Sequence, residues 1–206
     1  MAKIKQKLFL LFSLFSALSK VQSPSTAPGA SLGLRLPQHN NFRLLARNGR
    51  RNHDEVRLWA DYLSPDRDGY LIDDAGQRGG LAAEASFVIA GDLNADPVDG
   101  GSRNGAIRQL LEHPRVHREA SVGRWVPRSA GAAEAARRQG GANDRQLGPA
   151  NEDTADFSDG GMNSPGNLRV DYVLPSSDLA VCASGVYWPT QDDPAFAWVN
   201  DDAATS

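Results

Sequence analysis

Residues 85–97 constrain the fold of this chain most, because they join an apolar run to a group of polar side chains. Residues 85–90 are mostly apolar, with β-branched and aromatic side chains, and the run stops at Gly91, as buried strands often do. Asp92 and Asn94 follow, and residues two apart point to the same side of an extended chain. The sequence therefore predicts a carboxylate and a carboxamide at the tip of a buried strand. Asx residues also form simple turns, so that interpretation stays open.

A second strand is predicted over residues 168–176 from their alternating pattern. One face would carry Leu168, Val170, Tyr172 and Leu174, and the other Arg169, Asp171 and Val173. A carboxylate in the middle of a strand built for burial needs a partner, because burying an unpaired charge is costly. Asp171 therefore either pairs with Arg169 or another neighbour, or orients a catalytic base.

Two motifs, Gly91-Asp92-Leu93-Asn94 and Arg169-Val170-Asp171-Tyr172, follow each other at a separation of about eighty residues. Together they resemble the endonuclease/exonuclease/phosphatase family of metal-dependent phosphoesterases. Each motif is short, but the pair is specific. The segments 47–57 and 185–189 look like those of a secreted bacterial branch, and the resemblance covers residues 47–206.

The resemblance implies an α+β fold in which two mixed β-sheets flanked by helices form a four-layer α/β sandwich. It also implies one or two Mg²⁺ or Mn²⁺ ions, for which oxygen ligands are suitable. In this pattern Asp92 would orient or deprotonate the attacking water and contact the metal. Asn94 would bind the scissile phosphate or the metal, and Asp171 would orient a histidine near the end of the domain.

Three parts of the family pattern are not found in the sequence. No Ser-Asp-His segment precedes Ser206, and residues 20–46 hold no strand with the family's Asn and metal-binding Glu. A histidine followed by a proline-rich stretch is also missing, since His39 lacks that context. We therefore expect a partial sandwich with an incomplete N-terminal half and impaired phosphoesterase activity. The alternative is a non-catalytic exported remnant or binding module.

Residues 1–19 resemble a signal peptide, with three lysines, an apolar run over residues 8–18 and small residues near its end. The apolar run is shorter than the about 20 residues that a spanning helix needs. We expect a secreted protein with no stable membrane span after cleavage, although an uncleaved anchor stays open. Residues 20–46, rich in Pro, Ser, Gly and Ala, are predicted to be a linker before a domain at 47–206.

The charge of the chain limits its partners. The formal net charge is −3, and removing the three lysines of the expected signal peptide gives −3 − 3 = −6. An acidic chain disfavours tight non-specific binding to nucleic acid, which depends on phosphate neutralisation. The expected partner is a phosphate-ester substrate, with nucleic acid among the candidates, and the oligomeric state is not predicted.

A calcium-binding loop is an alternative for the first motif, because Asp92, Asn94 and Asp96 are spaced as in the start of an EF-hand. Pro97 stands where that loop needs glycine, and Arg103 where it needs glutamate. The EF-hand interpretation is therefore rejected.

Other metal sites are less well supported. His113 and His117 are four residues apart, but Pro114 interrupts a helix between them and no zinc motif is present. The acidic segment 153–159 could bind a cation, although a solvated loop is the more economical interpretation.

Helices are predicted over residues 52–63 and 103–113, each ended by a proline. Residues 129–149 are predicted to be a long loop or weak helix, and Cys182 is predicted to be buried in an apolar run.

Overall fold

The computed structural model describes residues 9–12 and 40–199, with side chains described from residue 48 onward. The described strands are β1 (Phe9–Phe12), β2 (Phe87–Asp92) and β3 (Asp171–Pro175). The α-helices are α1 (Asn40–Tyr62), α2 (Arg108–Leu111), α3 (Arg118–Ser121) and α4 (Ala130–Gln139). Short 3₁₀ helices are η2 (Asp68–Tyr70), η3 (Arg103–Gly105), η4 (Asn143–Arg145), η5 (Ala150–Glu152) and η6 (Pro194–Trp198).

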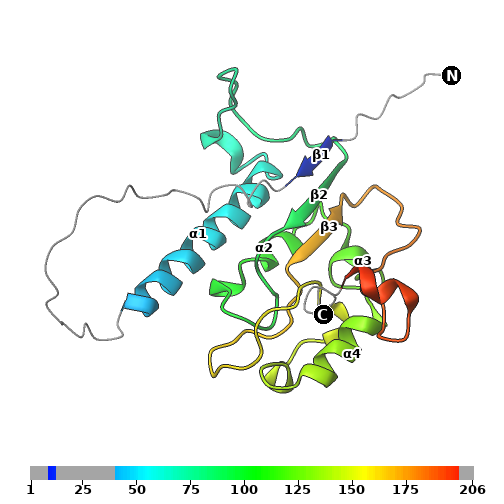
Figure 1. Ribbon diagram of the computed structural model, residues 1–206. Coiled ribbons are helices and arrows are strands. Elements are labelled where there is room, and N and C mark those ends of the chain that lie inside the picture. The colour runs from blue at the N-terminus through cyan, green and yellow to red at the C-terminus, as the bar shows by residue number, and fades with distance from the viewer. Residues whose placement is uncertain (1–8, 13–39, 200–206) are drawn as a thin grey trace, which may run out of the picture.

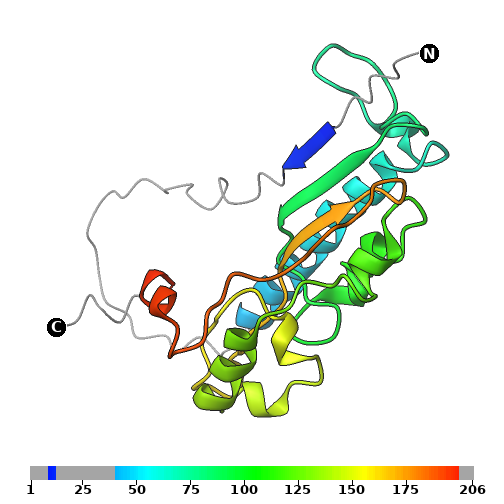
Figure 2. The same cartoon turned by 90° about the vertical axis from the view of Figure 1, so that its right-hand side faces the viewer.

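β2 lies at the centre of the sheet, between β1, which runs parallel to it, and β3, which runs antiparallel (Figures 1 and 2). The register of β2 and β3 places Ile89 opposite Leu174 and Asp92 opposite Asp171. Side chains alternate between the two faces of a strand. The sheet therefore has one apolar face and one face that ends in two carboxylates.

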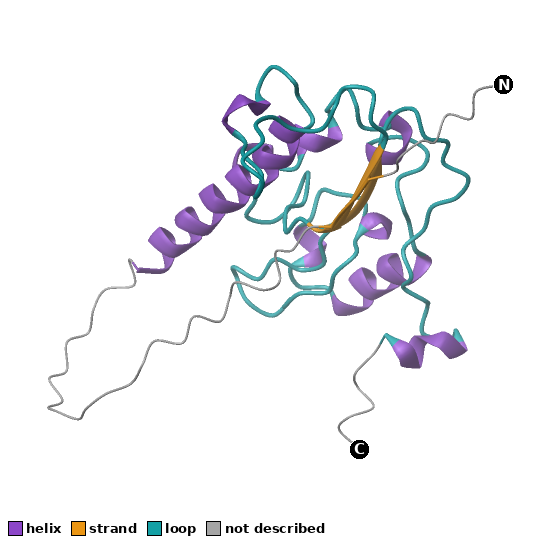
Figure 3. Cartoon of the chain, turned by 90° about the horizontal axis from the view of Figure 1, so that it is seen from above, coloured by secondary structure: helices purple, strands orange, loops and turns teal. Residues whose placement is uncertain are grey.

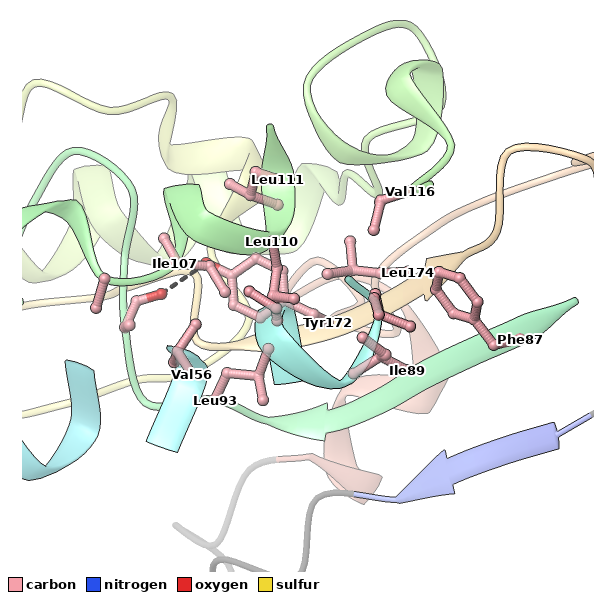
Figure 4. Close-up of a cluster of buried hydrophobic side chains, with 14 of the residues drawn as sticks. Val56, Phe87, Ile89, Leu93, Ile107, Leu110, Leu111, Val116, Tyr172 and Leu174 are labelled. Atoms are coloured by element: carbon pink, nitrogen blue, oxygen red, sulfur yellow. Dashed lines mark hydrogen bonds between the residues drawn. The ribbon is translucent and has the colours of Figure 1, made fainter. Parts of the chain in front are cut away.

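The apolar face is covered by α1 and α2, as the close-up of the core shows (Figure 4). Val56, Ala60 and Leu63 recur at the helical spacing of four and three residues, so they form one buried stripe along α1. They pack in one cluster with Phe87 and Ile89 of β2. Complete burial of a side chain such as Phe87 is worth about 1.5–3 kcal/mol, so this interface holds the sheet against the helices.

The opposite face of the sheet is open to solvent near β3, where Val173 is 59% exposed. The long helix α1 runs to one side of the strands in the view from above (Figure 3). The described residues thus form a mixed α+β fold. Within them we observe one sheet, so the second sheet of the expected four-layer sandwich is not seen in this part of the chain.

The expected signal peptide lies outside the described residues except for Phe9–Phe12, which form β1. Residues 20–39 of the expected linker also lie outside them. Helix α1 begins at Asn40, whereas the predicted helix began at Asn52. Leu, Ala and Arg in residues 40–46 favour helix, although the buried apolar stripe of α1 starts only at Val56.

Of two further predictions, the loop or weak helix at 129–149 is a helix over part of its length, and the expected burial of Cys182 was wrong. Residues 130–139 form the regular helix α4, because they are rich in alanine and Ser129 caps the first turn by accepting a hydrogen bond from the Ala132 amide. Cys182 is exposed, since the segment that carries it runs along the surface. Across residues 40–199, none of the helices combines the length and apolarity that crossing a membrane requires.

Candidate active site

Asp92 and Asp171 are direct cross-strand partners at the end of the β2–β3 ladder. Side chains at such positions share a face of the sheet, with Cβ atoms about 4.5–5.5 Å apart. Both residues are exposed. Gly91 precedes Asp92 with φ 144°, a conformation that side-chain-bearing residues rarely adopt. The two motifs therefore converge at one end of the sheet.

Asn94 lies on a tight turn directly beyond β2. Its backbone is left-handed, with φ 46°, which asparagine tolerates better than most residues. Its amide donates a hydrogen bond of 2.7 Å to Oδ1 of Asp92, and the Leu93 amide donates one of 2.8 Å to the Val170 carbonyl. Asn52 of α1 donates from Nδ2 to the Leu93 carbonyl at 2.9 Å. Asp92 thus forms an Asx turn, and that turn holds Asp92 and Asn94 in fixed positions relative to each other.

Asp171 does not form an ion pair with Arg169, which was one of the two predicted alternatives. Arg169 is buried instead, 5% exposed, with Nη1 3.7 Å from a Glu152 oxygen and its guanidinium 4.9 Å from the centre of the Tyr172 ring. The predicted alternation therefore holds for Asp171 to Leu174 but fails at Arg169, which precedes the strand.

Partial burial of the carboxyl group raises the pKa of Asp171; the Thr154 hydroxyl opposes that rise, and the charge of Asp92 adds to it. The backbone amide of Asp171 donates a hydrogen bond of 3.0 Å to Thr154 Oγ1. A cation placed between two neighbouring carboxylates would relieve the repulsion of their charges. Thr154, which holds this strand end in place, was not singled out by the sequence, because the contact joins residues 17 positions apart.

Asp96 and Asp99 stabilise the loop that follows β2, because their carboxylates accept hydrogen bonds from backbone amides. Asp96 accepts hydrogen bonds from the amides of Val98, Asp99 and Arg169, at 2.7, 2.6 and 2.8 Å. Asp99 accepts hydrogen bonds from the amides of Leu147 and Gly148. Both carboxylates are therefore occupied by backbone donors, which agrees with the rejection of an EF-hand.

The two spaced histidines also have structural roles. Nε2 of His113 lies 3.0 Å from Oγ of Ser64, and Nδ1 of His113 accepts a hydrogen bond from the Arg115 amide. His117 caps α3 through the Ala120 amide, and its own amide binds the Pro175 carbonyl, at the opposite end of β3 from Asp171. Between residues 48 and 199, no hydrogen bond or ion pair joins a histidine to Asp171.

A cleft of about 250 Å³ adjoins Asn94 and lies between α1 and the loop that follows β2. Its polar lining includes Asn48, Asn52 and Ser102, and its apolar lining includes Phe157 and Val170. The hydroxyl of Ser102 is buried and finds no hydrogen-bond partner in the part of the chain that the structure describes. This cleft could not be predicted from local sequence pattern, because its walls come from four separate segments.

Asp153 is a buried acid that the sequence analysis assigned to a solvated loop. It is 7% exposed, and its Oδ2 has no partner within residues 48–199. Burial, followed by the charges of Asp96, Asp99 and Glu152, raises its pKa to about 7. The folded state therefore retains a proton that the unfolded chain releases near the ordinary value of 3.8, and stability falls as the pH rises from about 4 to about 7.

We expect Asp153→Asn to stabilise the protein increasingly over that range, because the amide mimics the neutral acid and does not ionise. The rise in pKa sets a limit of about 4 kcal/mol, and we expect a gain of about 1–3 kcal/mol at pH 8. Urea unfolding at pH 4, 6 and 8 measures the effect. The matched control is Asp74→Asn, an exposed carboxylate on a distant loop, and a pH-independent difference for Asp153→Asn would contradict the assignment.

The Endonuclease/Exonuclease/phosphatase family model matches residues 18–203, which include both motifs and the ladder that joins them. The chain belongs to this family. No curated protein and no solved structure matches it. The endonuclease/exonuclease/phosphatase match begins before residue 47, where the resemblance was expected to start, and it supports a phosphoesterase-type activity on phosphate-ester substrates.

Members of the endonuclease/exonuclease/phosphatase family generally use divalent metal ions, and the donors at this site fit such an ion. Asp92, Asp171 and Asn94 offer hard oxygen atoms, which Mg²⁺ and Mn²⁺ prefer. Among the described residues, no group of three or more His, Cys, Asp and Glu side chains gathers into a metal site. Mg²⁺ commonly keeps several waters and is bound through one or two carboxylates together with substrate phosphate.

Proposed function

We propose that this chain carries a metal-dependent phosphoesterase site built from Asp92, Asn94 and Asp171. The observation that supports it most directly is the cross-strand pairing of Asp92 with Asp171, with Asn94 on the turn that Asp92 itself closes. This arrangement joins carboxylate and carboxamide oxygens at one sheet end beside an open cleft. Such groups on rigid elements are suited to holding a cation and a phosphate together.

Each residue has a distinct role in the proposal. Asp92 and Asn94 hold Mg²⁺ or Mn²⁺, and a bound cation supplies polarisation of the phosphoryl oxygen and stabilisation of the leaving group. Asp92 also orients the attacking water, and Asn94 contacts the scissile phosphate. Asp171, whose pKa is raised, would orient a histidine at the strand end, a partner that residues 48–199 do not supply.

We further propose that the protein is secreted after removal of residues 1–19 and that its fold is a partial form of the family's four-layer sandwich. The open face of the sheet, where Val173 is 59% exposed, is consistent with a further layer. The substrate is a phosphate ester, with nucleic acid among the candidates.

We propose that turnover by this chain is slow, because no histidine stands beside Asp171 in residues 48–199. Loss of one general acid or base lowers a rate by about 10²- to 10⁴-fold. The effects on rate of losing residues that act as a catalytic unit are strongly non-additive. Asp92 and Asn94 alone therefore cannot compensate for a missing histidine. The alternative function is a module that binds metal and phosphate without turnover.

The test measures hydrolysis of bis(p-nitrophenyl) phosphate and p-nitrophenyl phosphate by the purified chain with Mg²⁺, Mn²⁺ or EDTA. We expect slow hydrolysis that requires the metal and disappears in EDTA, with Asp74→Asn unchanged as a control for an exposed carboxylate. Hydrolysis that persists in EDTA would contradict the proposal. Mn²⁺ binding without any turnover, measured by calorimetry, would favour the binding module.

A further inference from the structure

A second pocket of about 250 Å³ lies between α4 and the segment 187–199, which includes η6. Figures 1 and 2 show η6 beside α4, on the side of the molecule away from α1. The pocket is lined by three aromatic residues, a cation, an anion and a hydroxyl: Tyr187, Trp188, Phe196, Arg138, Asp156 and Thr154. None of Asp92, Asn94 and Asp171 lines this pocket.

The backbone of the aromatic segment is fixed to the start of α4. Oγ of Ser129 donates a hydrogen bond to the Trp188 carbonyl, and a Cβ atom at Gly131 would collide with that same carbonyl. The Gln191 amide lies 3.4 Å from both carboxylate oxygens of Glu134. These contacts involve the main chain of the segment, so its rings are not needed to hold it in place.

The three aromatic rings of this pocket are at least partly exposed to solvent. Tyr187 is 63% exposed, and Trp188 and Phe196 are only partly buried. Aromatic rings held on a fixed backbone and left accessible are suited to stacking against a planar ligand. Stacking of this kind tolerates different bases, because every base has a π face.

The polar groups of the pocket specify the ligand further. The Arg138 guanidinium lies 5.7 Å from the centre of the Phe196 ring, where it can pair with an anion or stack on a ring. Asp156 offers carboxylate oxygens to N–H donors on a ring edge and is itself held by Gln139. A planar ring with N–H donors and an attached phosphate is a nucleobase linked to a phosphate group.

Thr154 joins this pocket to the candidate active site. It lines the pocket, and its Oγ1 accepts hydrogen bonds of 3.0 Å from the amides of Val170 and Asp171. We propose that the pocket binds the nucleobase of a nucleotide unit next to the scissile phosphate. This inference rests on the proposed function, because it places the base beside the phosphate that Asp92 and Asn94 would hold.

The test measures binding in EDTA, where turnover does not interfere. A fluorescein-labelled six-nucleotide single strand is compared with an abasic strand of the same length and phosphate number, at fixed salt because phosphate contacts depend on salt. We expect the strand with bases to bind about tenfold more tightly, within the range of base–aromatic stacking. Trp188→Ala should reduce that ratio to below about twofold, because it removes the stacking surface.

The matched control is Trp125→Ala, since Arg124 lies 5.4 Å above the Trp125 ring in a similar cation–π pair outside the pocket. It should keep the full ratio. If Trp188→Ala does not fold, as judged by circular dichroism, Arg138→Gln replaces it, because Arg138 is exposed on α4 and its loss leaves the core intact.

A competition arm with thymidine 5′-monophosphate and ribose 5-phosphate distinguishes the source of the base. Displacement of the strand by the nucleotide but not by the sugar phosphate supports a pocket that also takes free nucleotides. Tighter binding of the strand with bases than of the abasic strand, without displacement by either small competitor, supports a pocket for nucleic acid. Equal binding of both strands together with equal competition would overturn the inference, whereas loss of metal-dependent hydrolysis alone would overturn only the proposed function.

Discussion

Replacing Asp92 with alanine is expected to lower metal-dependent hydrolysis of a phosphodiester by about 10²- to 10⁴-fold. The carboxylate would hold the cation and orient the attacking water, and its removal leaves Asp171 alone at the strand end. Because the starting turnover is expected to be slow, Mn²⁺ affinity is measured in parallel. It should fall at least about tenfold, as expected when a metal site loses a supporting group.

Asp92→Asn separates the charge of this side chain from its structural role. The amide oxygen can still accept the Asn94 amide, so the turn is retained while the negative charge is lost. Hydrolysis should fall as in the alanine variant. The negative charge of Asp92 raises the pKa of Asp171, so the acid limb of any remaining pH–rate profile should move to lower pH. Activity equal to that of the unmodified chain in both variants would show that Asp92 is not part of the site.

Replacing Arg115 with methionine is expected to destabilise the fold by about 3–5 kcal/mol, because four carbonyls lose a charged donor worth about 1 kcal/mol or more each. Its Nη1 donates to the carbonyls of Leu63 and Leu81, at 3.1 and 3.3 Å. Its Nη2 donates to those of Ala82 and Ala85, at 2.9 and 2.8 Å. The guanidinium therefore ties the end of α1 to the segment that leads into β2.

Urea unfolding monitored by circular dichroism measures this effect, and Arg118→Met, at an exposed arginine in the same region, is the matched control. Arg115→Lys should recover less than half of the loss, because an ammonium lacks the planar fork that reaches four acceptors. A loss below about 1 kcal/mol for Arg115→Met would mean that water replaces these bonds without cost.

The parts of the fold that the sequence predicted are those set by local pattern. The apolar run before Gly91 and the alternation from Asp171 to Leu174 predicted β2 and β3, whereas the register that places Asp92 opposite Asp171 is known only from the structure. Periodicity also placed Val56 in the core. Each of these patterns is complete within a few residues.

The parts that could not be predicted depend on partners distant in the chain. Thr154 is defined as a site residue only by its contact with Asp171, and the buried position of Arg169 only by Glu152 and the Tyr172 ring. The acid at Asp153 has the composition of a solvated loop, and its burial depends on how that loop folds over residues 96–99. Contacts between residues so far apart in the sequence cannot be predicted from local sequence pattern.

The hydrogen bond from Asn52 to the Leu93 carbonyl has a consequence for how often the site is correctly shaped. It makes one turn of α1 a support for the backbone that carries Asn94. Helix turns open locally far more often than whole domains unfold. Each such opening removes a donor from the Leu93 carbonyl and releases the left-handed turn next to it. The fraction of molecules in which Asn94 is correctly placed is therefore limited by local unfolding of α1. A protein that is folded by any global measure can still spend part of its time with this turn disordered.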